Sequence, residues 1–349
     1  MPLFSATCPL PKNQMVRRHK AFSPANIAGL SLWLKADAGT TTVAEQFISQ
    51  IIFSGAGTTT SNGTYTRASG GNTSFTGPNE NTLNLNEVDE GTMYFQIFDT
   101  DFNDTTYTVG ILYDQITFIG TSNGEGPNPT ATTSLTATGN TIVTAWADQS
   151  GNGKNMTALA GSEPTFIASE LNGKPVIDFA TSKYLTASFA PINFTQQTVF
   201  VVFKFVSENL SSFARPFSQS NIDYGDYDTP GNLLPILRND GTDYMWCFSA
   251  TDSFLVGSPT SDNAWYISTT KTDGTNGSFL INATNEQAFE TTFDASITNM
   301  RVGGALFPAG ELNDPFNSKL AEVIVYDRNL TTPERQQIEA YLNTKYDIF

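Results

Sequence analysis

The chain has 349 residues and is rich in residues that build and connect β-strands, with 26 Phe, 12 Tyr and 27 Gly. Aromatic residues suit pleated strands and glycine suits the turns between them, so the composition predicts an all-β protein. The formal net charge of −16, from 18 basic and 34 acidic residues, argues against nucleic acid or an anionic membrane surface as the main partner.

Residues 1–21 form a basic arm on an otherwise acidic chain. The arm contains Lys12, Arg17, Arg18 and Lys20 and no acidic residue. Its charges follow a weakly apolar part without a continuous apolar run, which is not the pattern of a secretory signal, and no segment reaches the apolar length that crosses a bilayer. Two interpretations stay open: a disordered terminus, or an arm that orders against an acidic neighbouring subunit through Arg17, Arg18 and Lys20.

The cysteines and the histidine exclude several kinds of site. Cys8 and Cys247 are too few for a disulfide framework or a structural zinc site, and both are expected to be free thiols. The single histidine, His19, lies in the arm, which removes every Ser/His/Asp, Cys/His or multi-histidine arrangement from the rest of the chain.

Two β-rich segments come first in the chain. Residues 22–40 predict a short turn and then a strand, in which Leu30, Leu32 and Leu34 alternate with other residues. Residues 41–140 contain short runs such as "QIIFSGAG", "MYFQIFDT" and "TYTVGILY", bounded by Gly, Asn, Pro or Asp. This second segment has one basic and ten acidic residues, which indicates a separate module, and "GPNPTATTSLTATGN" closes it as a linker would.

The stretch "VTAWADQSGNGKNMT", residues 143–157, comes next. Strict alternation would place Val143 on one face of a strand and Thr144 and Trp146 on the other. Asp148 and Ser150 can then bond to amides of a Gly/Asn turn. A strand that ends in such a turn accounts for every residue, and a binding site for sugar or metal is the alternative.

The remaining sequence predicts a series of strands at spacings typical of a sandwich, followed by a helix. "TVFVVFKFV" and "LAEVIVYDR" are apolar on both faces and should be central strands covered by another layer. Asp327 and Arg328, after the second of them, are expected to form a structural pair.

One helix is predicted at the C-terminus, where Thr332 can cap it and Pro333 suits its first turn. Its apolar stripe should dock on the sandwich, with Leu330 stapling the entry and Ile348 and Phe349 sealing the far end. The stripe follows the spacing i, i+3, i+4, i+7 and consists of Ile338, Tyr341, Leu342 and Lys345.

The segments "LSLWLKADAGT", "VTAWADQSGNGKN", "LNGKPVIDFATSKYL" and "LAEVIVYDRNLTTPERQQIEAYLNTKYDI" together resemble the concanavalin A-like lectin/glucanase domain of the LamG-like jelly-roll type. Versions with these motifs are common in virion proteins of bacteriophages and large viruses and in bacterial surface proteins. The resemblance covers residues 22–40 and 141–349. It implies an all-β, concanavalin A-like jelly-roll β-sandwich with a C-terminal helix.

In that family the first two segments follow each other almost at once, whereas about a hundred residues separate them here. We therefore expect residues 41–140 to be an inserted small β domain in a surface loop of the sandwich. The Gly/Thr-rich text of the insert resembles small β modules of phage tail and fibre proteins.

Catalytic and metal sites have weak candidates. The glucanases of this superfamily use two or three carboxylates on alternate strand positions, and the nearest text here, "NEVDEG" with Glu87, Asp89 and Glu90, lies in the insert. No catalytic residue is predicted. Clustered loop carboxylates suit Ca²⁺. The candidate ligands in "DTDFND" are Asp99, Asp101 and Asp104, although solvated turn acids are the more favoured interpretation of this run and of "DYGDYD".

Sugar binding by this fold needs exposed aromatic rings beside hydrogen-bonding groups. In "DYGDYD" tyrosines alternate with acids in a predicted loop, so Tyr224, Tyr227, Asp226 and Asp228 are the candidate carbohydrate contacts. Trp246 and Trp265 are further candidates, although core positions are the more favoured interpretation for both.

The resemblance, the missing catalytic set and the arm together predict a non-enzymatic bacteriophage virion structural protein, anchored by its arm. A capsid decoration, a head fibre, a tail fibre or an adsorption component would fit. The expected partners are other virion proteins and host-surface polysaccharide, and a homo-oligomer such as a trimer is expected by analogy. The alternatives are a carbohydrate-binding module of a cell-surface protein and, less favoured, a glycoside hydrolase.

Overall fold

The computed structural model describes residues 22–54, 63–67, 74–76, 82–88, 92–97, 105–112, 115–121, 130–180, 182–206, 214–221, 233–239, 243–249, 252–259, 261–290, 295–306 and 312–349. Within 46–138, 231–260 and 306–313 only the backbone of these residues is described.

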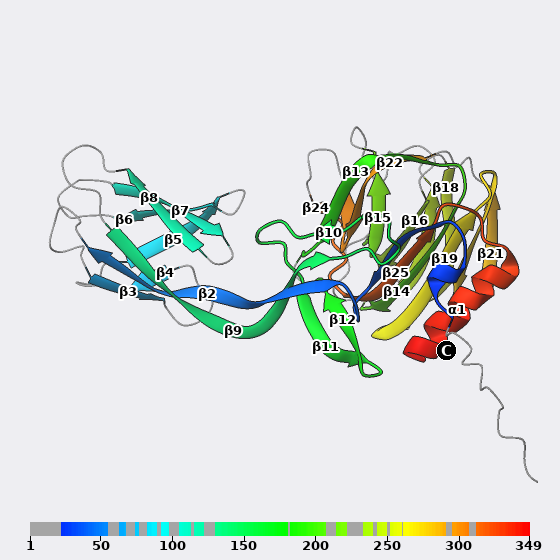
Figure 1. Cartoon of the computed structure of the whole chain (residues 1–349), viewed down its shortest axis with the longest axis horizontal. Coiled ribbons are helices and arrows are strands. Elements are labelled where there is room, and N and C mark those ends of the chain that lie inside the picture. Colours follow the sequence, from blue (N-terminus) through cyan, green and yellow to red (C-terminus); the bar gives the residue numbers. More distant parts are fainter. Residues whose placement is uncertain are drawn as a thin grey trace, which may run out of the picture.

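The first layer is an antiparallel sheet in which the two apolar strands lie at the centre (Figure 1). Strand β25 pairs with β1 on one side and with β14 on the other, and β12 joins the start of β25. The order across the sheet is β21 (Thr284–Glu290), β20 (Asn276–Ile281), β19 (Ala264–Thr272), β14 (Gln197–Phe205), β25 (Lys319–Tyr326) and β1 (Leu30–Lys35). Strand β12 (Lys174–Asp178) pairs with the first residues of β25.

The second layer is also antiparallel and faces the first. Its order is β9 (Thr130–Trp146), β10 (Met156–Thr157), β13 (Leu185–Phe194), β22 (Ala295–Val302) and β15 (Phe217–Ser220). Strand β11 (Thr165–Leu171) pairs with both β9 and β12 and so joins the layers. Smaller ladders are β23 (Ala305–Leu306) with β24 (Leu312–Asn313), and β16 (Leu233–Asn239), β17 (Asp243–Ser249) and β18 (Asp252–Pro259).

The main core lies between the layers. Alternate residues of each strand point inward because successive side chains of a strand face opposite sides of the sheet. Members of this core include Leu32, Leu34, Val201, Phe203, Val323 and Val325 from the first layer, and Val143, Trp146, Leu185, Phe194, Met300 and Val302 from the second. The chain is therefore an all-β, jelly-roll-like sandwich with a C-terminal helix, and the predicted fold class is confirmed.

Helix α1 (Thr332–Tyr346) covers the other face of the first layer, so β14 and β25 are buried on both faces as predicted. Ile338 and Leu342 of the predicted stripe pack with Leu330 against Phe200 and Ile324 of the sheet. Ile348 packs at the far end as expected, whereas Phe349 remains 49% exposed, so its predicted sealing role is wrong. No helix of the described residues is both long and apolar enough to cross a membrane.

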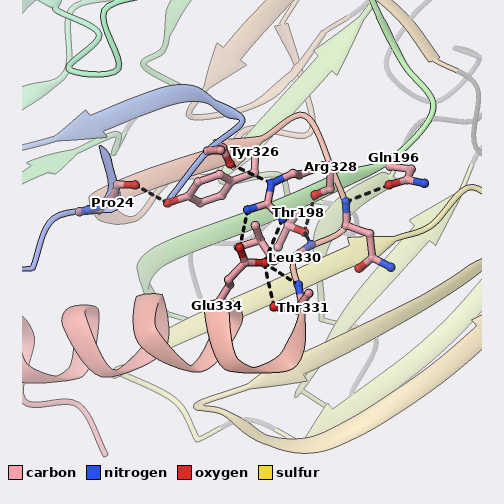
Figure 2. A network of polar contacts seen from close by, with 10 residues as sticks. Pro24, Gln196, Thr198, Tyr326, Arg328, Leu330, Thr331 and Glu334 are labelled. Atoms are coloured by element: carbon pink, nitrogen blue, oxygen red, sulfur yellow. Dashed lines mark hydrogen bonds and ion pairs between the residues drawn. The ribbon is translucent and has the colours of Figure 1, made fainter. Parts of the chain in front are cut away.

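The start of α1 differs from the prediction in two details (Figure 2). The N-cap is Thr331 rather than Thr332, because Glu334 accepts hydrogen bonds from both the amide and the hydroxyl of Thr331. Arg328 pairs with Glu334 and not with Asp327, while the Asp327 amide donates to the Gly29 carbonyl. The loop between β25 and α1 is thus tied to the first turn of the helix.

Residues 41–140 contain a two-stranded ribbon and a further group of strands. Strand β2 (Thr40–Ser54) pairs with β9 from Thr40↔Trp146 to Ser54↔Thr130, and both strands leave the sandwich together (Figure 1). Residues 130–140, expected to be linker, are part of β9. Between the two ribbon strands come β3 (Gly63–Arg67), β4 (Ser74–Thr76), β5 (Thr82–Val88), β6 (Thr92–Ile97), β7 (Thr105–Leu112) and β8 (Gln115–Thr121).

Strand β9 departs from the expected alternation. Val143 and Trp146 both point into the main core, although they are three residues apart. The β2–β9 register shifts between Ala145 and Val143, so Thr144 is an extra residue in a β-bulge. The predicted assignment of Val143 and Trp146 to opposite faces is therefore wrong.

Candidate functional site

Most site residues proposed from the sequence lie outside the described residues and stay predictions. These are the carbohydrate candidates Tyr224, Tyr227, Asp226 and Asp228, the calcium candidates Asp99, Asp101 and Asp104, and the attachment residues Arg17, Arg18 and Lys20. Within the described part of the chain, no group of three or more His, Cys, Asp or Glu side chains could hold a metal ion.

The other named candidates are placed only in part. Glu87 belongs to β5, of which the backbone alone is described, and Asp89 and Glu90 lie outside the described residues. Trp246 belongs to β17, again described by its backbone. Trp265 is half-buried and packs against the cluster beneath α1, so it lies at the edge of the core rather than within it.

The Asp148 turn is a structural joint rather than an open site. The Asp148 carboxylate accepts hydrogen bonds from the Trp33 amide at 3.0 Å, from the Ser150 amide and hydroxyl at 2.8 Å each, and from the Lys154 amide at 3.2 Å. The Gln149 amide donates to the Trp33 carbonyl at 2.7 Å. The turn therefore fastens the end of β9 to the edge of β1, and the carboxylate has no free side to offer a ligand.

The second half of the turn is bonded to a carbonyl that a bulge leaves free. The β1–β25 register shifts between Leu30 and Leu32, and the Ser31 carbonyl accepts from Lys154 Nζ at 2.7 Å and from Asn152 Nδ2 at 3.1 Å. Burial lowers the pKa of Lys154, and this effect outweighs the negative charge of Asp148, which acts to raise the pKa. The structural interpretation of this stretch accounts for its polar groups.

A different polar surface lies on the outer face of the second layer. Where β13, β22 and β15 run side by side, the apolar residues point into the core and the alternate ones point away from it. Ser188 Oγ donates to Asn299 Oδ1 at 2.6 Å, and Ser218 Oγ donates to the Gly304 carbonyl at 2.9 Å. The residues that point away from the core are Thr186 and Ser188 of β13, Asn299 and Arg301 of β22, and Ser218 and Ser220 of β15; we call them the polar face. Arg301, Ser218 and Ser220 are nevertheless buried, so the exposed part of the face lies over β13 and Asn299.

An arginine stacked on a tyrosine lies at one end of the polar face. The guanidinium carbon of Arg301 is 4.3 Å from the ring centroid of Tyr184, and Nη1 donates to the Ala305 carbonyl at 2.6 Å. Such stacking is a cation–π contact. Nearby, Gly303 packs tightly against the residues before β13, since a Cβ there would lie 2.3 Å from the Phe179 ring and 2.6 Å from the Lys183 carbonyl oxygen.

A buried carboxylate follows in the neighbouring loop. The Ser162 carbonyl accepts from the Tyr184 amide at 3.0 Å, which sets Glu163 beside the start of β13. Glu163 is 8% exposed, and its Oε1 has no hydrogen-bond partner within the described part of the chain. A buried oxygen without a donor costs free energy, so Glu163 is a strained group beside the start of β13.

This arrangement combines an aromatic ring, a guanidinium, an amide, hydroxyls and a carboxylate acceptor on one side of the sandwich. Only the exposed or half-buried members, Tyr184, Thr186, Ser188 and Asn299, can reach a ligand, and their ring, hydroxyls and amide suit a sugar. Tyr184, Arg301 and Glu163 were missed in the sequence because they belong to three separate segments. Only the alternation of polar and apolar residues in "YLTAS" and "TNMRV" pointed to the face.

No protein-family model and no curated protein sequence matches this chain. Among solved structures, a GH54 α-L-arabinofuranosidase soaked with 4-nitrophenyl α-L-arabinofuranoside is 10% identical with a TM-score of 0.47, over 76% of this chain and 63% of that one. Domain 4 of a GH43 extracellular arabinanase from Geobacillus stearothermophilus, in complex with arabinotriose, is 14% identical with a TM-score of 0.41, over 55% of this chain and 92% of that one.

The binding domain of botulinum neurotoxin serotype G is 12% identical with a TM-score of 0.42, over 57% of this chain and 49% of that one. This chain therefore spans less than two thirds of the arabinofuranosidase and about half of the toxin domain. No ligand or activity follows for this chain from similarities of this size.

Proposed function

We propose that this chain is a non-enzymatic structural protein of a bacteriophage virion, in which the sandwich is the base and the β2–β9 ribbon carries the insert outward. The ribbon is the observation that carries the proposal. A strand of 15 residues such as β2 has a contour length of about 50 Å, and β9 pairs with it throughout. A capsid decoration, head fibre, tail fibre or adsorption component uses such a projection to present one part of the chain away from another.

Two sequence features support the same proposal. The strand and helix "AEVIVYDRNLTTPERQQIEAYLNTKY" are similar to those of virion versions of the jelly-roll domain. The basic arm has the charge to bind an acidic neighbour, either another virion protein or a second copy of this acidic chain.

The non-enzymatic part of the proposal rests on the carboxylate that lies between the first layer and α1. Glu322 lies on β25, is 0% exposed, and accepts hydrogen bonds from Trp33, Tyr341, Tyr346 and Lys345. A carboxylate enclosed in this way is not presented to a substrate.

Particle association tests the proposal. Antibodies against the chain should label purified phage particles in electron micrographs, and the protein should copurify with them through a density gradient. A variant without residues 1–21 should fold and yet stay in the soluble fraction, whereas a variant without residues 55–129 should still attach. A full-length protein that is found only free in the lysate would refute the virion role.

A carbohydrate-binding module is a second candidate, favoured by the polar face. We infer that a glycan would contact Tyr184, Ser188 and Asn299, which are the exposed or half-buried groups on this side of the sandwich. Glycan-array binding should weaken at least tenfold in Tyr184→Ala and Asn299→Ala. Gln287→Ala, on the exposed edge strand of the other layer, is the matched control and should bind normally.

The same array separates this face from the loop predicted in the sequence. Loss of binding in Tyr224→Ala or Tyr227→Ala, with Tyr184→Ala unaffected, would place the contact in "DYGDYD" instead. Polysaccharide cleavage by the purified protein would favour the glycoside hydrolase alternative.

A further inference from the structure

A lysine and an aspartate meet beside a buried glutamate where the C-terminal helix crosses the first strand of the sandwich. Lys345 Nζ lies 2.8 Å from Asp37 Oδ1 and 2.9 Å from Glu322 Oε2. The side chains of Glu322, Lys345 and Asp37 are 0%, 11% and 31% exposed. The amine is therefore close to two carboxyl groups, that of Glu322 fully buried and that of Asp37 partly exposed to solvent.

The backbone holds Asp37 in place. The amide of Ala36 donates to the Ala321 carbonyl at 2.9 Å, and the amide of Ala38 donates to the Lys35 carbonyl at 3.0 Å. The β14–β25 register shifts at Ala321, and this bulge frees its carbonyl for the first of these bonds. The backbone on both sides of Asp37 is thus bonded in place, and its side chain lies beside the lysine.

Aromatic donors hold Glu322. Trp33 Nε1 donates to Oε1 at 2.6 Å, Tyr341 OH donates to Oε1 at 3.1 Å, and Tyr346 OH donates to Oε2 at 2.8 Å. Burial, followed by the charge of Glu322, raises the pKa of both tyrosines above the usual range, so they remain protonated donors. The lysine amine completes the set of donors.

We propose that Lys345 and Asp37 condense into an intramolecular isopeptide bond, with Glu322 as the proton relay. The product is an amide between the Lys345 Nζ and the Asp37 Cγ, which joins α1 covalently to the turn after β1.

The step balances without any co-reactant. A proton passes from the lysine ammonium to the aspartate carboxylate, directly or through Glu322, which leaves a neutral amine and a neutral carboxylic acid. The amine lone pair attacks Cγ, Glu322 accepts a proton from nitrogen and returns one to the departing hydroxyl, and one water molecule leaves. Glu322 ends in the state in which it began.

Three physical effects favour the bond. Glu322 is fully buried with an oxygen 2.9 Å from the amine, so a proton acceptor is already in place for the step. Fixed contact between reacting groups can provide effective molarities of about 10⁵ M or more. In the product, the new amide N–H can still donate to Glu322, so the buried carboxylate keeps all four of its donors.

A second lysine pair provides an internal comparison. Lys319 Nζ also lies 2.8 Å from a carboxylate oxygen, that of Glu170, but both side chains are about a quarter exposed. The only other ion-pair partner of Glu170 in the described part of the chain is Lys204, and no buried carboxylate accompanies the pair. The distance from the amine to the carboxylate is thus the same in both pairs, but the Lys319 pair has no counterpart of Glu322 to transfer protons. Lys319 should therefore remain unmodified.

Mass spectrometry of the full-length folded protein tests the proposal. The intact mass should be lower than the sequence mass by one water. Trypsin should then fail to cut after Lys345, and residues 336–349 should appear joined to residues 36–67. The peptide bond after Lys319 should be cut normally. An intact mass equal to that of the sequence, with normal cleavage after Lys345, would overturn the proposal. A loss of water that maps to other residues would overturn it as well.

Variants test the chemistry. Lys345→Arg should keep the ion pair and restore the full sequence mass. Asp37→Asn should lose one ammonia instead of one water, because an amide nitrogen becomes the leaving group. Glu322→Gln should fold, as judged by circular dichroism, and remain unlinked; a fully linked Glu322→Gln protein would refute the relay role. Lys319→Arg is the matched control and should still lose one water.

Discussion

Arg328 and Glu334 form a two-point ion pair across the start of α1, with Nη1 2.9 Å from Oε2 and Nη2 2.7 Å from Oε1 (Figure 2). Such a geometry fixes the orientation of both side chains as well as their distance. The Arg328 Nε also donates to the Ala28 carbonyl at 2.9 Å. The pair thereby connects the N-terminal turn of the described chain, the end of β25 and the helix.

The first prediction concerns pH. The hydrogen bonds from Arg328, then those from Thr331, lower the pKa of Glu334 to about 2, below the value of about 4.3 of an unfolded glutamate. A depressed folded-state pKa contributes stability that is present above about pH 4 and is lost as the pH falls toward 2. Because both partners are about 30% exposed, the contribution should be about 1 kcal/mol or less.

Denaturant unfolding at several pH values checks this. Glu334→Gln should lower the free energy of unfolding by that amount at pH 7 and should differ little from the wild type near pH 2. A difference that stays constant down to pH 2 would contradict the assignment.

The second prediction concerns the Asp148 turn. Asp148→Ala leaves the Trp33, Ser150 and Lys154 amides without their acceptor and should lower the free energy of unfolding by about 2–3 kcal/mol. Asp148→Asn keeps one acceptor oxygen and should lose less. The control is Asp273→Ala, which removes an exposed turn carboxylate that bonds only to its own hairpin, and it should lose about 1 kcal/mol or less. Equal losses in Asp148→Ala and Asp273→Ala would show that the Asp148 turn does not fasten β1.

The central elements could be predicted because their signals are local. "TVFVVFKFV" and "LAEVIVYDR" are apolar at most positions on both faces, and such a run can be recognised without knowing which strands lie beside it. The stripe of α1 follows the helical period, and Ile338 and Leu342 are buried as it implies. The cap differed by one residue because either of two adjacent threonines could precede Pro333, and only the reach of Glu334 selects Thr331.

The remainder depends on contacts between distant segments. The bulge at Thr144 changes which residues face the core, and nothing in "VTAW" distinguishes a bulged strand from a regular one. Lys345 was expected at the edge of the stripe with its stem packed. Its ammonium instead pairs with Glu322 and Asp37, and these three residues come from three separate elements. The polar face is hidden for the same reason, since Tyr184 and Arg301 meet only in the folded sheet.

The third prediction concerns Gly303, which has a φ of +95° and lies against the Phe179 ring. Gly303→Ala adds a clash to backbone strain and should lower the free energy of unfolding by more than about 2 kcal/mol. Gly153→Ala is the matched control, because Gly153 has a φ of +73° and open space around it; it should lose only about 1 kcal/mol. Equal losses in denaturant unfolding would mean that the packing beside Tyr184 and Arg301 adapts to the new methyl group.

The fourth prediction concerns the bulge in β9. Deletion of Thr144 would leave Val143 and Trp146 two residues apart, so a regular strand could still point both into the core. The Thr144 carbonyl accepts from the Ala158 amide, and losing this bond should cost about 1–2 kcal/mol. Deletion of Ser268 is the control, because β19 pairs without a shift on both sides and every residue beyond the deletion would change face. Thermal unfolding should show a cooperative transition for the first variant and none for the second. If deletion of Thr144 abolished the transition while deletion of Ser268 did not, the bulge would be required for the sandwich to close, and alternation alone would not determine which residues of β9 enter the core.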